Sequence, residues 1–150
     1  MEKSDARNLP LGIITGVLAA VIGAVIWALV TVTINYQIGW MALGVGFLVA
    51  YAMRLFGGGS NPSFGAIGAV IALMGCIGGN ILTIVLLVAN HENIGVMTVL
   101  ARLSPQVVMG ILRETFQPMD FLFYAIAMYE AYKFSMTRSA PALEPAPQME

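Results

Sequence analysis

The sequence is poor in charged side chains. Of its 150 residues, 10% are charged and 59% are hydrophobic, whereas soluble domains carry about 25% charged residues. A soluble domain this short has a large surface for its volume and needs many polar groups to cover it. The composition therefore predicts that lipid surrounds most of the chain. The formal net charge of −1 provides no basic field for phosphate groups, so nucleic acid is excluded as a partner.

The sequence also lacks the residues of common catalytic and metal sites. Cys76 is the single cysteine and His91 the single histidine, so an internal disulfide, a multi-cysteine metal site and a paired-histidine haem site are excluded. The patterns GxxxxGK[ST], HExxH, CxxC and GxSxG do not occur. We therefore expect a non-enzymatic protein with no cofactor and no metal.

Two long stretches contain no ionised side chain. No Asp, Glu, Lys or Arg lies between Arg7 and Arg54, and none lies between Arg54 and Glu92. An uncharged apolar run beyond about 18 residues predicts a membrane-spanning helix. The first stretch holds two crossings and the second holds one. Residues 9–34 exceed the roughly 7–15-residue core of a cleaved signal peptide, so this run is expected to be a retained helix.

The predicted fold is an all-α membrane protein with four transmembrane helices and a short amphipathic interfacial segment. Pro10 and Pro62 suit helix starts, and the glycine run 57–59 suits a break. Residues 1–8 are a polar head, and residues 137–150, with three prolines, are expected to be a disordered tail. Within the transmembrane domain, 9–136, the helices are predicted at 9–34, 38–56, 62–89 and 119–136.

The segment 94–117 is expected to lie at the membrane surface or against the bundle. Its second half places polar residues on one stripe and apolar residues on the other, which is typical of an amphipathic helix. The polar stripe contains Gln106, Gly110, Arg113 and Gln117. With four crossings, five of the seven cations fall on the side of the termini, and Arg102 and Arg113 fall opposite. This bias predicts a multi-pass protein with both termini in the cytoplasm.

Small residues recur at every fourth position of the predicted helices. Helices in lipid associate by close packing, which small residues permit. The stripes contain Gly12, Gly16, Ala20 and Ala24 in the first helix, Gly46 in the second, and Gly75 and Gly79 in the third. They predict either packing within one chain or, for the first helix, contact with another copy in a homo-oligomer.

Two polar side chains are predicted at membrane depth. Glu130 lies about eleven residues into the last helix, where a charge costs about 2.5–3.5 kcal/mol and needs a partner or water. It is interpreted either as an ion-pair partner of Lys133 or Arg54, or as a protonatable group in a proton or cation path. Asn80 is interpreted as an interhelical hydrogen-bonding group or as part of a polar pocket.

Three segments carry a resemblance to a known group. They are YAMRLFGGG at 51–59, GAIGAVIALMGCIGGN at 65–80 and FLFYAIAMYEAYK at 121–133. They resemble small, uncharacterised bacterial four-helix membrane proteins, some of which carry a zinc-ribbon-like head that this chain lacks. The resemblance implies a bacterial inner-membrane location and brings no known activity, cofactor or catalytic residue.

Two functions remain open at this stage. The first is a non-enzymatic scaffold or accessory bundle, assembled through the small-residue helix faces, with membrane lipid and a further copy of the chain as partners. The alternative is a small ion or proton channel or carrier that uses Glu130.

Overall fold

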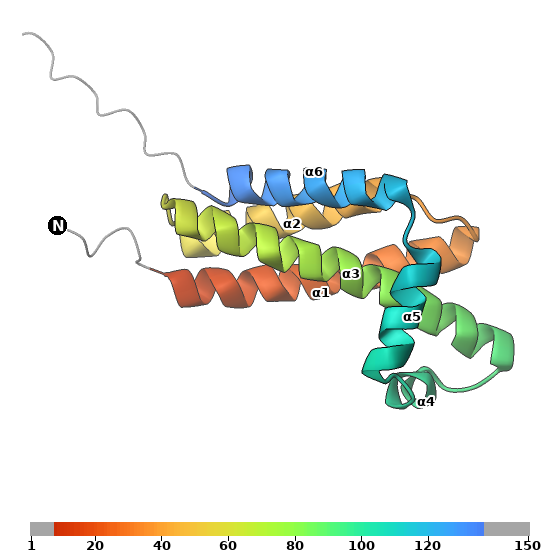
Figure 1. Cartoon of the computed structure of the whole chain (residues 1–150). Helices are drawn as coiled ribbons and strands as arrows, with labels where there is room; N and C mark the ends of the chain where they lie inside the picture. Colours follow the sequence, from red (N-terminus) through yellow and green to blue (C-terminus); the bar gives the residue numbers. More distant parts are fainter. Residues whose placement is uncertain (1–7, 137–150) are drawn as a thin grey trace, which may run out of the picture.

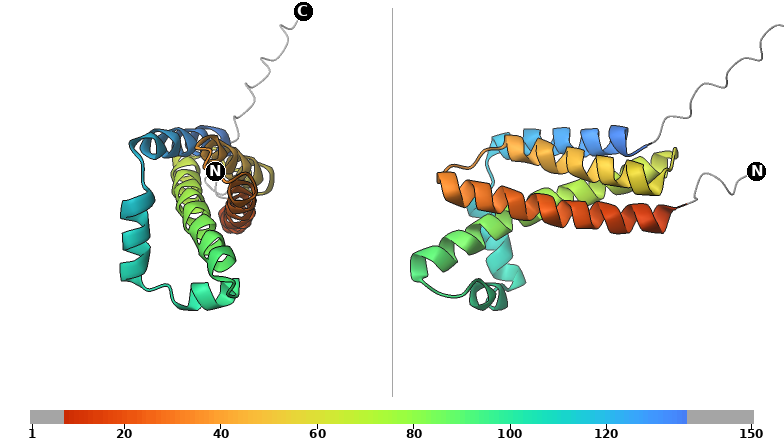
Figure 2. Two further views of the ribbon diagram at one scale, coloured as in Figure 1. Left: turned by 90° about the vertical axis from the view of Figure 1, so that its right-hand side faces the viewer. Right: turned by 180° about the vertical axis from the view of Figure 1, so that it is seen from behind.

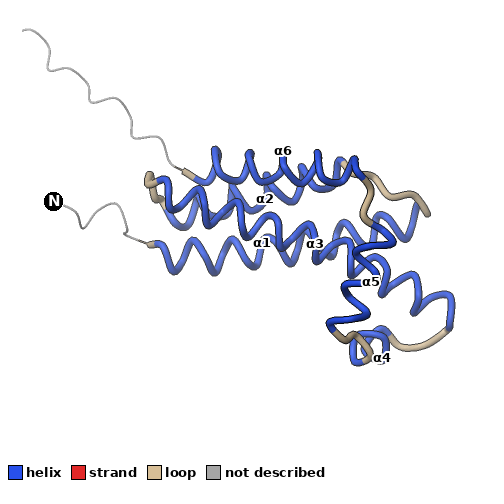
Figure 3. The backbone as a smooth tube through the Cα atoms, in the orientation of Figure 1, coloured by secondary structure: helices blue, strands red, loops and turns tan. Residues whose placement is uncertain are grey.

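The structure is a computed structural model that describes residues 8–136, and every regular element in this range is a helix. The elements are α1 (Leu9–Ile34), α2 (Trp40–Gly57), α3 (Pro62–Glu92), α4 (Val96–Ala101), α5 (Pro105–Thr115) and α6 (Pro118–Ser135). Short loops connect them (Figure 3). The predicted polar head, apart from Asn8, and the predicted tail 137–150 lie outside the described residues.

Proline and residues in the left-handed conformation set several helix ends. Pro10, Pro62, Pro105 and Pro118 occupy first turns, where the missing N–H has no intrahelical partner to lose. Asn35 and Asn93 end α1 and α3 with φ of 51° and 54°. Gly58 ends α2 with φ of 62°, a conformation that glycine adopts without a Cβ clash.

The observed helices differ from the predicted ones at several ends. The structure starts α2 at Trp40, two residues after the predicted 38, because Ile38 and Gly39 accept bonds in a preceding turn. It extends α3 from the predicted end at 89 to Glu92, since polar side chains do not interrupt backbone bonds. Within the predicted segment 94–117 the structure has two helices, α4 and α5, which agrees with the sequence, where Ser104 and Pro105 favour a helix start and 94–103 a second short helix. The Ser104 Oγ accepts a hydrogen bond from the Val107 N–H.

Four of the helices form one bundle. The helices α2 and α3 contact each other, α1 packs on both of them, and α6 packs on both as well. Figure 1 places the start of α1, the α2–α3 turn and the end of α6 at one end of this bundle. At the opposite end, the last third of α3 extends beyond the bundle and carries α4 and α5. Figure 2 shows α5 running across the bundle axis.

Alanine and glycine make many of the helix contacts inside the bundle, beside a few large buried side chains such as Trp27 and Met53. Ala28, Ala42, Ala50, Ala72 and Ala127 are fully buried. Large apolar residues lie outside, and in α1 they include Ile14, Leu18, Val21 and Leu29, each more than half exposed. This distribution is the reverse of a soluble domain and is expected where lipid tails cover the outer face.

Three helices, α1, α2 and α3, are long and apolar enough to cross a membrane. At about 1.5 Å per residue, α1 is about 39 Å long and α3 about 46 Å, against a hydrocarbon core of about 30 Å. Both helices are therefore longer than this core is thick. Toward the end of α3, Val85 and Ala89 form a second apolar cluster with Val99 of α4.

Candidate functional site

The small-residue stripe of α1 is buried inside the chain. Gly12 lies against Gly57 and Phe64, and Gly16 lies against Met53 and Ile71. Within the chain, α2 and α3 already cover this stripe. It is therefore not a free surface through which α1 could contact another copy.

The remaining packing residues of the prediction also lie at helix contacts within the chain. Gly75 and Gly79 of α3 lie against Ala20 and Ala24 of α1. Gly46 of α2 lies against the backbone of α6, where an added Cβ would come within 2.7 Å of the Ala127 carbonyl oxygen. The glycines thus allow two pairs of helices to approach with almost no side chain between them.

Glu130 lies on the face of α6 that is directed toward α2. It follows Ala127, which contacts Gly46, by three residues, and it precedes Phe134, whose ring lies 6.3 Å from that of Phe47. Residues three and four apart share a helix face. The Glu130 Oε2 atom is buried, and it has no hydrogen-bond partner among residues 8–136.

The predicted ion pair of Glu130 with Lys133 or Arg54 is wrong for the described part of the chain, where the one ion pair joins exposed His91 and Glu92. Lys133 has the i, i+3 spacing for a pair, but its Nζ lies 5.7 Å from the ring centre of Tyr129 and 5.9 Å from that of Phe134. These distances are within the range of cation–π contacts. Arg54 is exposed in the last turn of α2.

A second polar group lies at the opposite end of the bundle, around Asn80. The Asn80 side chain is 1% exposed, and its Oδ1 accepts a hydrogen bond of 3.4 Å from Gln37 Nε2. Its Nδ2 has no protein partner in the described range. The same is true of Trp27 Nε1 and Thr31 Oγ1, both on buried side chains of α1. Thr83 differs, since its hydroxyl donates to the Gly79 carbonyl at 2.8 Å.

Contacts between α1, α3 and α6 bring together Trp27, Tyr124 and the part of α3 around Asn80, and Thr31 lies on the same buried face of α1 as Trp27. Trp27 lies against Gly79, the residue before Asn80. The Trp27 and Tyr124 rings meet edge to face with centres 6.3 Å apart, and the Tyr124 hydroxyl donates to the Cys76 carbonyl at 3.5 Å. Thr31 follows Trp27 by one helical turn. We call Trp27, Thr31, Asn80 and Tyr124 the Asn80 cluster.

A polar cavity of about 400 Å³ lies next to the Asn80 cluster, at the end of the bundle. Gln37, the partner of Asn80, is one of its walls, and Gln117 and Asp120 are others. The Asp120 carboxylate accepts a hydrogen bond of 3.0 Å from the Gln117 N–H and closes the start of α6. This is a capping arrangement, which stabilises a helix start.

Glu130 and the Asn80 cluster are two separate places. Tyr124 belongs to the cluster, and Glu130 follows it by six residues, or about 9 Å along α6. Between the two levels the core is apolar and closely packed, since Ala127 of α6 is fully buried against Gly46 of α2. The structure therefore does not join Glu130 and Asn80 in one polar path.

The groups of the Asn80 cluster are suited to hydrogen bonding. The Asn80 cluster offers N–H and O–H donors, which can hold a small polar group. Cys76 is fully buried and its Sγ faces the Ala42 carbonyl at 3.8 Å. Within residues 8–136, no three His, Cys, Asp or Glu side chains are grouped so that they could hold a metal ion.

Sequence reasoning missed Trp27 and Thr31 as members of this cluster. A signal was present, because both continue the helix face of the buried Ala24 and Ala28 at spacings of three and four. Trp27 is fully buried, whereas Trp40 is 70% exposed at the end of the bundle.

Comparisons with models of known protein families, with curated proteins and with solved structures find no match to this chain.

Proposed function

We propose that the chain is a non-enzymatic integral membrane protein whose four long helices all cross the bilayer and serve as a scaffold or accessory bundle. In this proposal the termini lie on the cytoplasmic side of the cell membrane. The helices α4 and α5 then lie at the opposite surface. The observation that carries the proposal is the distribution of side chains, with alanine and glycine at the helix contacts inside the bundle and large apolar residues exposed on all four of its helices.

The fourth crossing is argued from the packing of α6. Its 18 residues span about 27 Å, near the lower limit for a crossing. Asp120 is placed at one end, where it caps the helix. Lys133 is placed near the other end, from which a long side chain reaches the membrane surface. Glu130 faces α2, so the lipid side of α6 is formed by residues such as Phe121, Leu122 and Ala125.

The α4–α5 segment is proposed to lie flat on the membrane. The helix α5 runs across the bundle axis (Figure 2), and it has no buried residue. Its apolar residues Ile111 and Leu112 are half-buried toward α3 and α6, while Gln106 and Arg113 are exposed. An amphipathic helix in this pose keeps its polar face in water.

The alternative function, a channel or carrier, rests on the unpaired Oε2 of Glu130. Against it stands the packed apolar core between Glu130 and the Asn80 cluster, which offers no polar group to a crossing ion. The homo-oligomer stays a prediction, and the α1 stripe does not support it because that stripe is occupied.

Labelling of single cysteines in liposomes tests the topology. In a Cys76→Ala background, Ser60→Cys and Met136→Cys are expected to react with a membrane-impermeant maleimide from one side, and Gln106→Cys from the other. Reaction of Met136→Cys from the same side as Gln106→Cys contradicts the fourth crossing, and reaction of Ser60→Cys from the same side as Gln106→Cys contradicts the crossing of α3.

Flux measurements separate the two functions. Liposomes containing the purified chain are expected to leak protons and monovalent cations no faster than empty liposomes. A leak that Glu130→Gln abolishes would establish the channel or carrier instead.

A further inference from the structure

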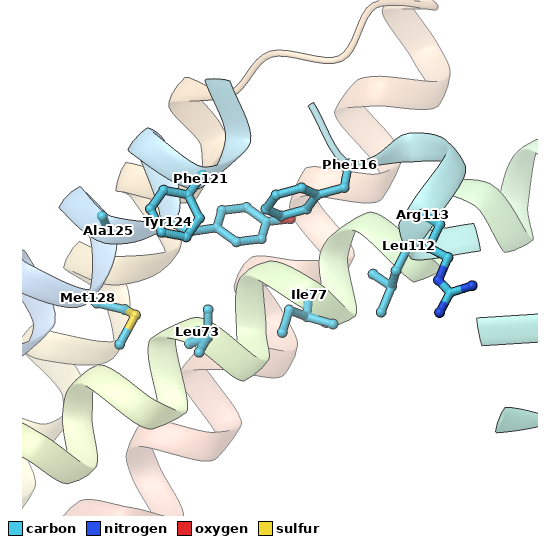
Figure 4. A pocket seen from close by; sticks show the side chains of 9 residues that line it. All are labelled: Leu73, Ile77, Leu112, Arg113, Phe116, Phe121, Tyr124, Ala125 and Met128. Atoms are coloured by element: carbon cyan, nitrogen blue, oxygen red, sulfur yellow. The ribbon is translucent and has the colours of Figure 1, made fainter. Parts of the chain in front are cut away.

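A groove with a volume of about 540 Å³ lies between α3, α5 and α6 (Figure 4). Leu73 and Ile77 line it from α3, and Phe121, Ala125 and Met128 line it from α6. Cavities that hold a drug-sized ligand range from about 300 to 1,000 Å³. The groove is therefore large enough for part of a lipid chain.

One end of this apolar groove carries a cation. Arg113 of α5 lies at the end away from Met128 (Figure 4). It is exposed and forms no ion pair with any of residues 8–136. No carboxylate lines the groove. The groove thus combines an apolar trough along two transmembrane helices with a single unpaired guanidinium at the membrane surface.

We infer that this groove binds one anionic phospholipid, with an acyl chain along Ile77 and Met128 and the phosphate on Arg113. The inference rests on the proposed four-helix topology, which places the trough in the hydrocarbon and α5 at its surface. A phospholipid matches both parts, because its chain is apolar and its phosphate accepts paired hydrogen bonds from a guanidinium. An apolar helix of another protein could also fill the apolar part of the groove, but such a helix need not carry an anionic group next to Arg113.

Tyr124 lines the groove and lies between it and the other members of the Asn80 cluster. The Tyr124 ring meets Phe116 of α5 at 5.9 Å on the groove side and Trp27 at 6.3 Å on the inner side. Phe116 and Tyr124 thus form the wall of the groove against which the acyl chain lies at the end near Arg113. The lipid consequently has no access to the buried polar groups.

Native mass spectrometry of the full chain in mild detergent tests the inference. The probes are dioleoyl phosphatidylglycerol and dioleoyl phosphatidylcholine, added as an equimolar mixture. The wild type is expected to retain one phosphatidylglycerol in preference to phosphatidylcholine. One basic side chain near a membrane surface contributes about 1 kcal/mol toward anionic lipid, so Arg113→Gln is expected to lower this preference about fivefold.

Three further variants test whether the preference for anionic lipid depends on Arg113 and on the apolar groove. Arg102→Gln removes the other exposed, unpaired cation of the same region, which does not line the groove, and is expected to leave the preference unchanged. Arg113→Lys is expected to retain most of it. Ala125→Leu fills the trough and is expected to lower the binding of both lipids without changing their ratio.

The inference is overturned if Arg113→Gln keeps the wild-type preference, or if Arg102→Gln lowers it equally. A spectrum dominated by a lipid-free dimer would also overturn it, since a second copy would then cover the groove. These results leave the proposed topology standing. Failure of that topology is recognised separately, by the cysteine labelling described above.

Discussion

Adding one methyl group to Gly46 should separate α6 from α2. A Cβ at this position would lie 2.7 Å from the Ala127 carbonyl oxygen and 2.9 Å from its Cα. Ordinary van der Waals contact starts at 3.4 Å, so α6 would have to move by about 0.7 Å, the difference between 3.4 and 2.7. Both contacts are with backbone atoms, which cannot rotate away as a side chain can.

Gly44 provides a matched control on the same helix. A Cβ at Gly44 would meet nothing within 4 Å. The gain in helix propensity from Gly to Ala is the same at both positions and cancels in the comparison. The difference that remains is the cost of overpacking, which is typically about 1–3 kcal/mol. Gly46→Ala should therefore be less stable than Gly44→Ala by this amount.

Reversible unfolding in mixed micelles measures the difference. The purified variants are titrated with sodium dodecyl sulfate in a mild detergent, and helicity and tryptophan emission are followed. The double variant Gly46→Ala, Ala127→Gly should not recover stability, because the clash is with the Ala127 backbone. Coinciding curves for Gly44→Ala and Gly46→Ala, or recovery in the double variant, would refute the α2–α6 contact described above.

Three further predictions follow from burial. Glu130→Leu should raise the free energy of unfolding by about 1–3 kcal/mol, because it removes a carboxylate whose Oε2 is buried without a described partner; a decrease would show that the carboxylate is paired. Cys76, with no exposed surface, should react with maleimide only after unfolding in dodecyl sulfate, and reaction in mild detergent would contradict its packing against α2. Iodide should quench the emission of wild-type protein but not that of Trp40→Phe, since the remaining Trp27 is fully buried; quenching of Trp27 would place water beside the Asn80 cluster.

Composition and spacing were enough to predict an all-helical fold with helices that can span a membrane, because both properties depend on residues that are neighbours in the sequence. A run without ionised groups is unstable in water wherever it folds, so α1, α2 and α3 are visible in the sequence. The prolines and the glycine run, which act on the local backbone, likewise marked most helix starts. The number of crossings depends on α6, whose Asp120, Glu130 and Lys133 weaken the hydropathy signal.

The sequence did not show which side chains and helices contact each other in the folded chain. The i, i+3 spacing predicted that Lys133 would pair with Glu130, yet the Lys133 ammonium lies over aromatic rings that are also on α6. The sequence of α6 allows either an ion pair of Lys133 with Glu130 or a contact of Lys133 with the aromatic rings. Which of the two forms depends on how α6 packs against α2. The stripe of α1 is a similar case, since small residues indicate a close contact without indicating which helix makes it.

The position of the charges suggests where selective contacts of this protein are made. Lipid tails satisfy the large apolar residues on the outside of the bundle as well as any partner would, so these faces provide little selectivity. The described cations and anions that lie outside the bundle, Glu92, Arg102, Arg113 and Glu114, are all carried between the end of α3 and the end of α5. Among the described residues, the other exposed cations are Arg54 and Lys133, toward the opposite end of the bundle. The end where α5 crosses the bundle axis is therefore the part of the described chain where charges of both signs are available to a partner or a lipid headgroup.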